Sequence, residues 1–142
     1  MSATLLPLVP PDYDPATDKT YMSPLMLAFF QQCLLEWRKE LITGSQETLA
    51  NLQTETLNAP EVGDRAAMEM DKALELRTRD RARKLISKID AALARIEDGD
   101  YGYCDDTGEP IGVGRLKARP IATLCIAAQE KHERDERMHR DN

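Results

Sequence analysis

Two cysteines in the C-terminal third of the chain lie in contexts that suggest half of a metal site. Cys104 begins the segment Cys-Asp-Asp-Thr107, and Cys125 begins the segment Cys-Ile-Ala-Ala128. A structural zinc site with four thiolates needs a cysteine at both ends of each such segment, so that four sulfurs converge tetrahedrally. Because Thr107 and Ala128 hold the second positions and neither is a zinc ligand, the pattern predicts a degenerate zinc-finger-like region without metal.

Two other interpretations of these cysteines stay open. His132 and His139 lie downstream and would complete a set of two cysteines and two histidines, although their spacing from Cys125 is long. Alternatively, Cys104 and Cys125 form a redox-sensing thiol pair, because sulfurs placed for a shared metal lie near enough for a reversible disulfide. The residues favour a metal-free packed turn over both.

A second group of candidate binding residues is basic. Guanidinium groups bind phosphate through two hydrogen bonds, so a cluster of them would hold a phosphorylated nucleotide at an interface. The alternative is a solvated helix face, whose cations pair with Asp71, Glu75, Asp80 and Asp90 at spacings of three or four residues. The basic residues are Arg77, Arg79, Arg81, Arg83, Lys84 and Lys88, followed by Arg115, Lys117 and Arg119.

Helical periodicity predicts the elements that would position these groups. Ser23 and Pro24 are a helix start signal, and the break at 58–63, which contains Pro60, is a stop. A second helix would begin after Asp64 as its N-cap and end at Gly99. Two helices of roughly 33 residues, each about 50 Å long, must run antiparallel when a short turn joins them. The apolar seams expected are Leu27, Phe30, Leu34, Trp37 and Leu41 on the first helix, and Met70, Leu74, Leu85, Ile89, Ala92 and Ile96 on the second.

These elements predict an all-α protein built on a long antiparallel coiled-coil hairpin. A proline-rich, extended N-terminal arm is expected over 1–20, and the N-terminal part of a globular region over 21–33. The hairpin is expected over 34–97, with its tip near 58–66. The degenerate zinc-finger region and a C-terminal helix, from about Ile121 to Met138, occupy 98–142, and this segment is too small to fold by burial alone.

Composition narrows the classes of function. The formal charge of −6 argues against non-specific binding to duplex DNA, which needs a basic surface. The sequence contains no apolar run of bilayer length, no signal peptide and no secreted disulfide framework, so a cytoplasmic protein is expected. It also lacks a phosphate-binding glycine loop, a Ser-His-Asp set and an HExxH motif, so we do not expect an enzyme.

Four segments of the chain form a distinctive set. They are Leu-Glu-Leu-Arg-Thr-Arg-Asp-Arg-Ala-Arg-Lys-Leu-Ile at 74–86, Gly-Tyr-Cys at 102–104, Arg-Leu-Lys-Ala-Arg-Pro at 115–120 and Leu-Cys-Ile at 124–126. Together they resemble the DksA/TraR family of transcription factors that bind RNA polymerase. The resemblance covers about 21–134. The departures at Thr107 and Ala128 are similar to the zinc-independent members of the family.

The resemblance implies a site at the hairpin tip. The family presents a D-x-x-D-x-A motif to the polymerase, and here Glu61, Asp64 and Ala66 stand at the motif positions, with Arg65 between the last two. The hairpin would enter the polymerase secondary channel, bringing this tip near the active centre, while the globular region docks on the rim. From the residues alone, Asp64 is also explained as a helix cap.

The resemblance further implies a ligand and a role. Guanosine tetraphosphate would bind at the polymerase interface through Arg81, Lys88 and Arg119, although Gln129 replaces a lysine of the family. The protein would be a monomer that modulates initiation at ribosomal and amino-acid promoters during the stringent response, without reading DNA sequence. The rival interpretations are a structural or adaptor coiled coil and the thiol sensor described above.

Overall fold

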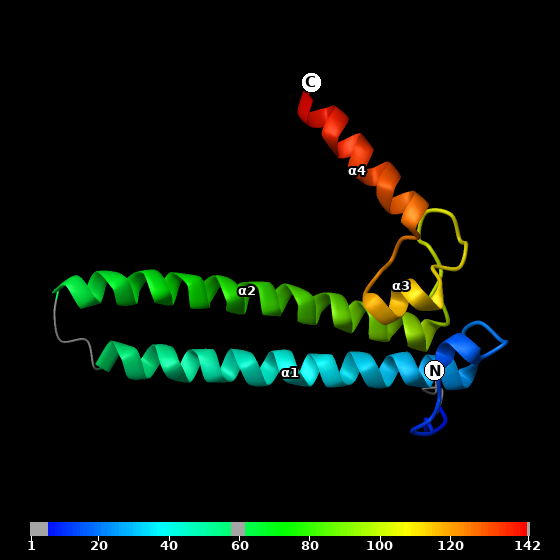
Figure 1. The fold of residues 1–142 in the computed structure, drawn as a ribbon, viewed down its shortest axis with the longest axis horizontal. Helices are drawn as coiled ribbons and strands as arrows, with labels where there is room; N and C mark the ends of the chain where they lie inside the picture. The colour runs from blue at the N-terminus through cyan, green and yellow to red at the C-terminus, as the bar shows by residue number, and fades with distance from the viewer. Residues whose placement is uncertain (1–5, 58–61, 142) are drawn as a thin grey trace. The chain divides into compact units, whose positions relative to one another are not determined.

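The computed structural model describes residues 6–57 and 62–141, with side chains described except at 48, 49, 51–57, 62, 63 and 141. The elements in chain order are η1 (Pro15–Thr17), α1 (Pro24–Leu57), α2 (Val62–Asp98), α3 (Val113–Ala118) and α4 (Ile126–Asp141) (Figure 1). Within these ranges the only extended pairing is an isolated bridge between Tyr103 and Pro110. The all-α prediction is confirmed. No helix among the described residues is long and apolar enough to cross a lipid bilayer.

The chain divides into two compact units. The hairpin unit contains Leu35–Asp90, and the globular unit contains Met1–Leu34 and Ala91–Asn142. Within the hairpin unit, α1 and α2 lie side by side and run in opposite directions, as the short connection between them requires (Figure 1). Residues 91–97, which the sequence assigned to the hairpin, fall in the globular unit.

α1 begins where the sequence predicts. Pro24 is its first residue, and the backbone N–H of Met26 donates a 3.2 Å hydrogen bond to the Ser23 hydroxyl oxygen. The Ser23 hydroxyl in turn donates to the Asp18 carboxylate at 2.6 Å, so the segment before the helix holds the cap in place. α1 ends at Leu57, immediately before the predicted break.

α2 begins earlier than predicted, and the assignment of Asp64 as its N-cap is wrong. Val62 and Gly63 are already helical, whereas an N-cap residue must have a non-helical backbone. Asp64 therefore lies inside the first turn, where its carboxylate is favoured by the positive end of the helix dipole. The predicted stop is confirmed, because Gly99 has a φ of 83° and the Asp100 N–H donates to the Arg95 carbonyl at 2.9 Å.

The apolar seam of α2 differs from the predicted one in the half of the helix nearer Val62. Ala82, Ile89 and Ile96 are buried and recur every seven residues, which fixes the buried face. Counting back along this face leads to the half-buried Glu75. The predicted seam residues Met70 and Leu74 instead lie on the solvent side, with 71% and 57% of their surface exposed. The prediction failed because the apolar residues near Val62 lie on a different face of α2 from the buried residues Ala82, Ile89 and Ile96.

The segment before α1, where the prolines predicted an extended arm, is partly folded. It contains the short helix η1, whose Pro15 is buried. The Asp14 carboxylate accepts a 3.0 Å hydrogen bond from the Ala16 N–H and lies 3.8 Å from the Lys117 ammonium of α3. Prolines exclude a long helix but permit a single 3-10 turn, which then packs on a neighbour.

Burial within the globular unit centres on aromatic residues. The Phe30 side chain is fully buried, and its ring centroid lies 5.7 Å from that of Tyr101. Tyr101 is 1% exposed and donates its hydroxyl to the Pro120 carbonyl at 2.7 Å, so its one polar atom is satisfied. Leu116 and Ile121 are also buried. The small segment after α2 thus folds against the start of α1.

The C-terminal helix starts later than predicted. Ile121 and Ala122 are buried in the connection that precedes it, and α4 begins only at Ile126. The Gln129 N–H donates to the Cys125 carbonyl at 2.9 Å, which closes the first turn of the helix. The connection before α4 also forms a backbone hydrogen bond with the first cysteine segment, and this contact is part of the candidate site.

Candidate functional site

The described residues of the predicted tip site are accessible. Asp64, Arg65 and Ala66 are exposed and lie in the first turns of α2, at the end of the hairpin that carries the connection between the helices. Glu61, the fourth predicted residue, lies outside the described residues. A carboxylate here is free to contact another macromolecule without first breaking a packed core.

The three predicted nucleotide-binding cations are exposed but belong to different units. Arg81 and Lys88 lie on α2 in the hairpin unit, and Arg119 ends α3 in the globular unit. In the part of the chain that the structure describes, none of the three side chains forms an ion pair. A shared site for them stays a prediction. Gln129, at the position of the missing lysine, donates its amide to Glu133 at 3.2 Å.

The structure gives limited support to the alternative in which the cations of α2 pair with carboxylates of the same helix. On α2, Arg83 pairs with Asp80 at 3.3 Å, and both side chains are largely exposed. Asp90 pairs with Arg38 of α1 at 2.7 Å rather than with a cation of its own helix. Most of the basic stripe is therefore available for an external anion.

The first cysteine segment forms a turn that stabilises a thiolate. Cys104 is buried, and its sulfur accepts hydrogen bonds from the Thr107 hydroxyl and from the backbone N–H groups of Asp106, Thr107 and Cys125. The Thr107 hydroxyl is the largest influence; together with the backbone donors it outweighs burial and lowers the pKa of the Cys104 thiol to about 6. The sequence predicted that Thr107 cannot bind zinc. Its role as a donor to the remaining sulfur was missed, because that role depends on the fold of the turn.

Hydrogen bonds and ion pairs join the two cysteine segments and their supporting helices. The Asp105 N–H donates to the Thr123 carbonyl at 2.9 Å, and the Asp105 carboxylate pairs with Arg95 of α2. The neighbouring Asp106 carboxylate lies 2.6 Å from the His132 Nε2 atom of α4. These contacts hold the turn to α2 and α4.

The donor set does not fit a tetrahedral zinc ion. Of the four predicted positions, only Cys104 and Cys125 carry thiols, and Ala128 is a buried apolar residue. The described residues contain no group of three or more His, Cys, Asp or Glu side chains that could hold a metal ion, so the arrangement with His132 and His139 is not assembled there. A structural zinc site needs four ligands.

The lowered thiol pKa predicts a pH-dependent stability. The pKa of Cys104 falls from an ordinary value of 9.0 to about 6 in the folded chain, so the folded state gains stability as pH rises from 6 to 9. That gain is complete above pH 9 and is lost as pH falls through 6. The free energy of unfolding of the natural chain, measured by urea titration with reductant and chelator, should therefore rise over this interval relative to Cys104→Ser.

Two further variants check the cause of this stabilisation. Thr107→Val removes the hydroxyl donor and should reduce the rise, while Cys33→Ser, at a half-buried cysteine of α1, should preserve it. Identical pH profiles for the natural chain and Cys104→Ser would contradict a stabilised thiolate.

Family models match most of the described chain. The model "DnaK suppressor protein DksA, N-terminal domain" matches residues 26–96, and the model "Prokaryotic dksA/traR C4-type zinc finger" matches residues 99–134. The second match includes both cysteine segments, although two of the four ligand positions hold Thr107 and Ala128.

Curated and solved relatives agree with these models. The RNA polymerase-binding transcription factor DksA of Caulobacter vibrioides NA1000 is 58% identical over 131 residues, or 92% of each chain. The Escherichia coli K12 protein of the same name is 46% identical over 114 residues, covering 80% of this chain and 76% of that one. The solved structure of transcription factor DksA2 from Pseudomonas aeruginosa has a TM-score of 0.78 at 42% identity, covering 84% of this chain and 92% of that one. The chain therefore belongs to the DksA family.

Proposed function

We propose that this protein binds RNA polymerase and regulates the initiation of transcription, acting by binding rather than by catalysis. The observation that carries the proposal is the 58% identity, over 92% of both chains, to a factor named for binding RNA polymerase. At such identity and coverage, the surface that a partner recognises is expected to be retained as well as the fold.

The proposed mode of binding is insertion of the hairpin into the polymerase secondary channel. α1 and α2 contain 34 and 37 residues, and helices of this size are about 50 Å long. Asp64 and Ala66, exposed in the first turns of α2, would then lie near the polymerase active centre. Bound metal ions and basic groups are strong local charges in such a centre, so one carboxylate there has a large effect.

Guanosine tetraphosphate is the proposed ligand of the complex, held by Arg81, Lys88 and Arg119 against the polymerase. Exposed guanidinium and ammonium groups without internal ion pairs support this assignment, because their charge is not already neutralised. Gln129 supplies no charge, so we expect weaker binding than in a relative with a lysine at this position. The globular unit would contact the polymerase rim, and the chain would act as a monomer.

The globular unit is proposed to work without zinc. Two thiols provide half of the ligands of a structural site, and the hydrogen bonds to the Cys104 sulfur replace part of what a metal would do for that thiolate. Purified protein should contain far less than one zinc ion per chain by elemental analysis. Stoichiometric zinc would overturn this part of the proposal.

An in vitro transcription assay tests the function as a whole. Added to polymerase, the chain should change the lifetime of open complexes at a ribosomal promoter, and guanosine tetraphosphate should enhance the change. A second factor known to occupy the secondary channel should compete with it. Binding without competition, and without any effect on initiation, would instead favour the adaptor coiled coil.

A further inference from the structure

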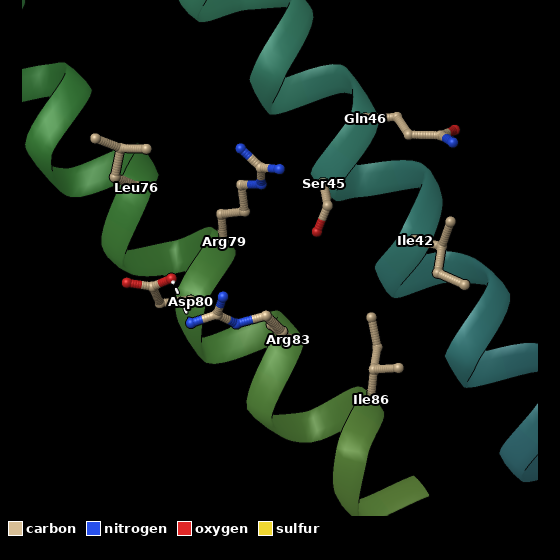
Figure 2. A pocket seen from close by; sticks show the side chains of 8 residues that line it. All are labelled: Ile42, Ser45, Gln46, Leu76, Arg79, Asp80, Arg83 and Ile86. Atoms are coloured by element: carbon tan, nitrogen blue, oxygen red, sulfur yellow. Dashed lines mark ion pairs between the residues drawn. The ribbon is translucent and has the colours of Figure 1, made fainter. Parts of the chain in front are cut away.

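A cavity of about 420 Å³ lies between α1 and α2 within the hairpin unit. Ile42 and Ser45 of α1 line it, as do Arg79 and Ile86 of α2. In Figure 2 the Arg79 and Ser45 side chains point into the gap between the helices, while Ile42 and Ile86 face each other at one end. Small-molecule sites usually occupy about 300–1,000 Å³, so the cavity is large enough for a compact ligand.

The cavity lies where the coiled-coil seam becomes polar. On α1, the half-buried residues Ile42 and Ser45 line it, whereas the exposed Gly44 does not. On α2, the half-buried Ile86 lines it together with Arg79, which lies three residues before the buried Ala82. Where a coiled coil normally packs two apolar side chains, this hairpin has a serine and an arginine.

The lining is suited to an anion. Arg79 and Arg83 lie one helical turn apart, and only Arg83 has a carboxylate partner, Asp80, at 3.3 Å. Among the described residues, Arg79 forms no ion pair, and its guanidinium carries a rigid set of donors that matches phosphate or carboxylate. The Ser45 hydroxyl lies on the opposite helix and offers one more donor. The lining contains two cations, Arg79 and Arg83, and one anion, Asp80, so its net charge is positive.

The rest of the lining consists of the polar residue Gln46 and three branched apolar residues. Ile42 and Ile86 form a wall at one end, and Leu76 contributes another branched side chain. Burying a small hydrocarbon body against such a wall is favourable by roughly 25 cal/mol per Å² of apolar surface. The combination of a charged side and an apolar end selects an amphipathic ligand over a bare ion.

We propose that this cavity binds a small molecule that carries one phosphate or carboxylate group on a compact aromatic or branched apolar body. Arg79 and Ser45 would bind the oxyanion from opposite helices, and Ile42 and Ile86 would contact the apolar body. This site is separate from the predicted nucleotide-binding residues and does not depend on polymerase. A ligand held by both helices stabilises the hairpin by mass action, so its binding raises the melting temperature.

Nuclear magnetic resonance titration of the full chain tests the site with phenyl phosphate and benzoate as probes. The expected result is a saturable shift of the Gly44 and Ser45 amide signals and of the Arg79 Nε–H signal with at least one probe. Comparing the two probes shows which oxyanion the site prefers. Inorganic phosphate and benzyl alcohol, which each lack one half of the ligand, should bind at least about tenfold more weakly.

Three variants separate the cavity from general basic attraction. Arg79→Gln should weaken binding about tenfold or more, the loss expected for one charge-assisted hydrogen bond. Ser45→Leu should fill the cavity and abolish binding while the hairpin stays folded by circular dichroism. Arg77→Gln is the matched control, because Arg77 is an exposed cation of α2 that does not line the cavity, and its binding should be unchanged. The proposal would be overturned if all variants bound the probe with equal affinity, or if benzyl alcohol bound as tightly as the probe. It would also be overturned if Arg77→Gln lost as much affinity as Arg79→Gln.

Discussion

Replacing Asp64 by asparagine is expected to abolish most of the effect of this protein on open-complex lifetime while leaving its affinity for RNA polymerase nearly unchanged. The carboxylate is exposed in the first turn of α2, so its loss disturbs no packed core. Removing a charge from a close electrostatic contact costs roughly 2 kcal/mol or more, which corresponds to at least about a tenfold loss of effect. Promoter-complex decay assays and a direct binding assay measure the two properties separately.

A matched substitution controls for general changes of charge. Asp71→Asn removes the same charge from an exposed position two turns further along α2 and should leave regulation intact. Melting temperatures of both variants should stay close to that of the natural chain, since a first-turn carboxylate contributes only about 0.3–1 kcal/mol through the helix dipole. An Asp64→Asn protein that binds polymerase and regulates normally would remove the tip from the mechanism.

Replacing Phe30 by alanine should give the largest loss of stability of any single change considered. Phe30 is fully buried and lies within 5.7 Å of the rings of both Phe29 and Tyr101, measured between centroids. Truncating a buried phenylalanine costs about 3–5 kcal/mol through lost burial and the remaining cavity. A small protein has only about 5–15 kcal/mol of stability in total, so a substantial unfolded fraction is expected near physiological temperature. Urea denaturation followed by circular dichroism measures the loss.

Met70→Ala is the matched control for this prediction and also tests the seam of α2. Met70 is 71% exposed, so its truncation should change the free energy of unfolding by no more than about 0.5 kcal/mol. A loss comparable to that of Phe30→Ala would mean that Met70 belongs to the seam, as its sequence pattern first suggested. A small effect of Phe30→Ala would in turn contradict the packing of the globular unit.

The start of α1, the end of α2 and the loss of zinc ligands were readable from the sequence because all three depend on local chemistry. Ser23 with Pro24 starts a helix, and Gly99 stops one, through backbone hydrogen bonds that involve only nearby residues. The identities of Thr107 and Ala128 rule out two thiolate ligands in any fold. The same helix signals predicted the hairpin, which the structure confirms. The family resemblance predicted the tip and nucleotide-binding residues, which stay predictions.

Other features were decided only by tertiary structure, because they depend on contacts between residues far apart in the chain. The sequence pattern placed Met70 and Leu74 in the apolar seam of α2. In the structure, the packed face of α2 is the one that carries its buried residues, and Met70 and Leu74 do not lie on that face. The N-terminal prolines excluded a long helix, but the burial of Pro15 required a neighbour.

The segment that begins at Cys104 likewise has one feature that its sequence determines and another that only the tertiary structure determines. Its residue types determined that a tetrahedral zinc site is incomplete, since ligand chemistry belongs to each side chain by itself. Only the folded turn brings the Thr107 hydroxyl and the backbone N–H of Cys125 to the Cys104 sulfur, where they lower the pKa of its thiol together with the N–H groups of Asp106 and Thr107. The cavity beside Arg79 likewise depends on the pairing of two helices, because residues of both α1 and α2 line it and neither helix encodes it alone.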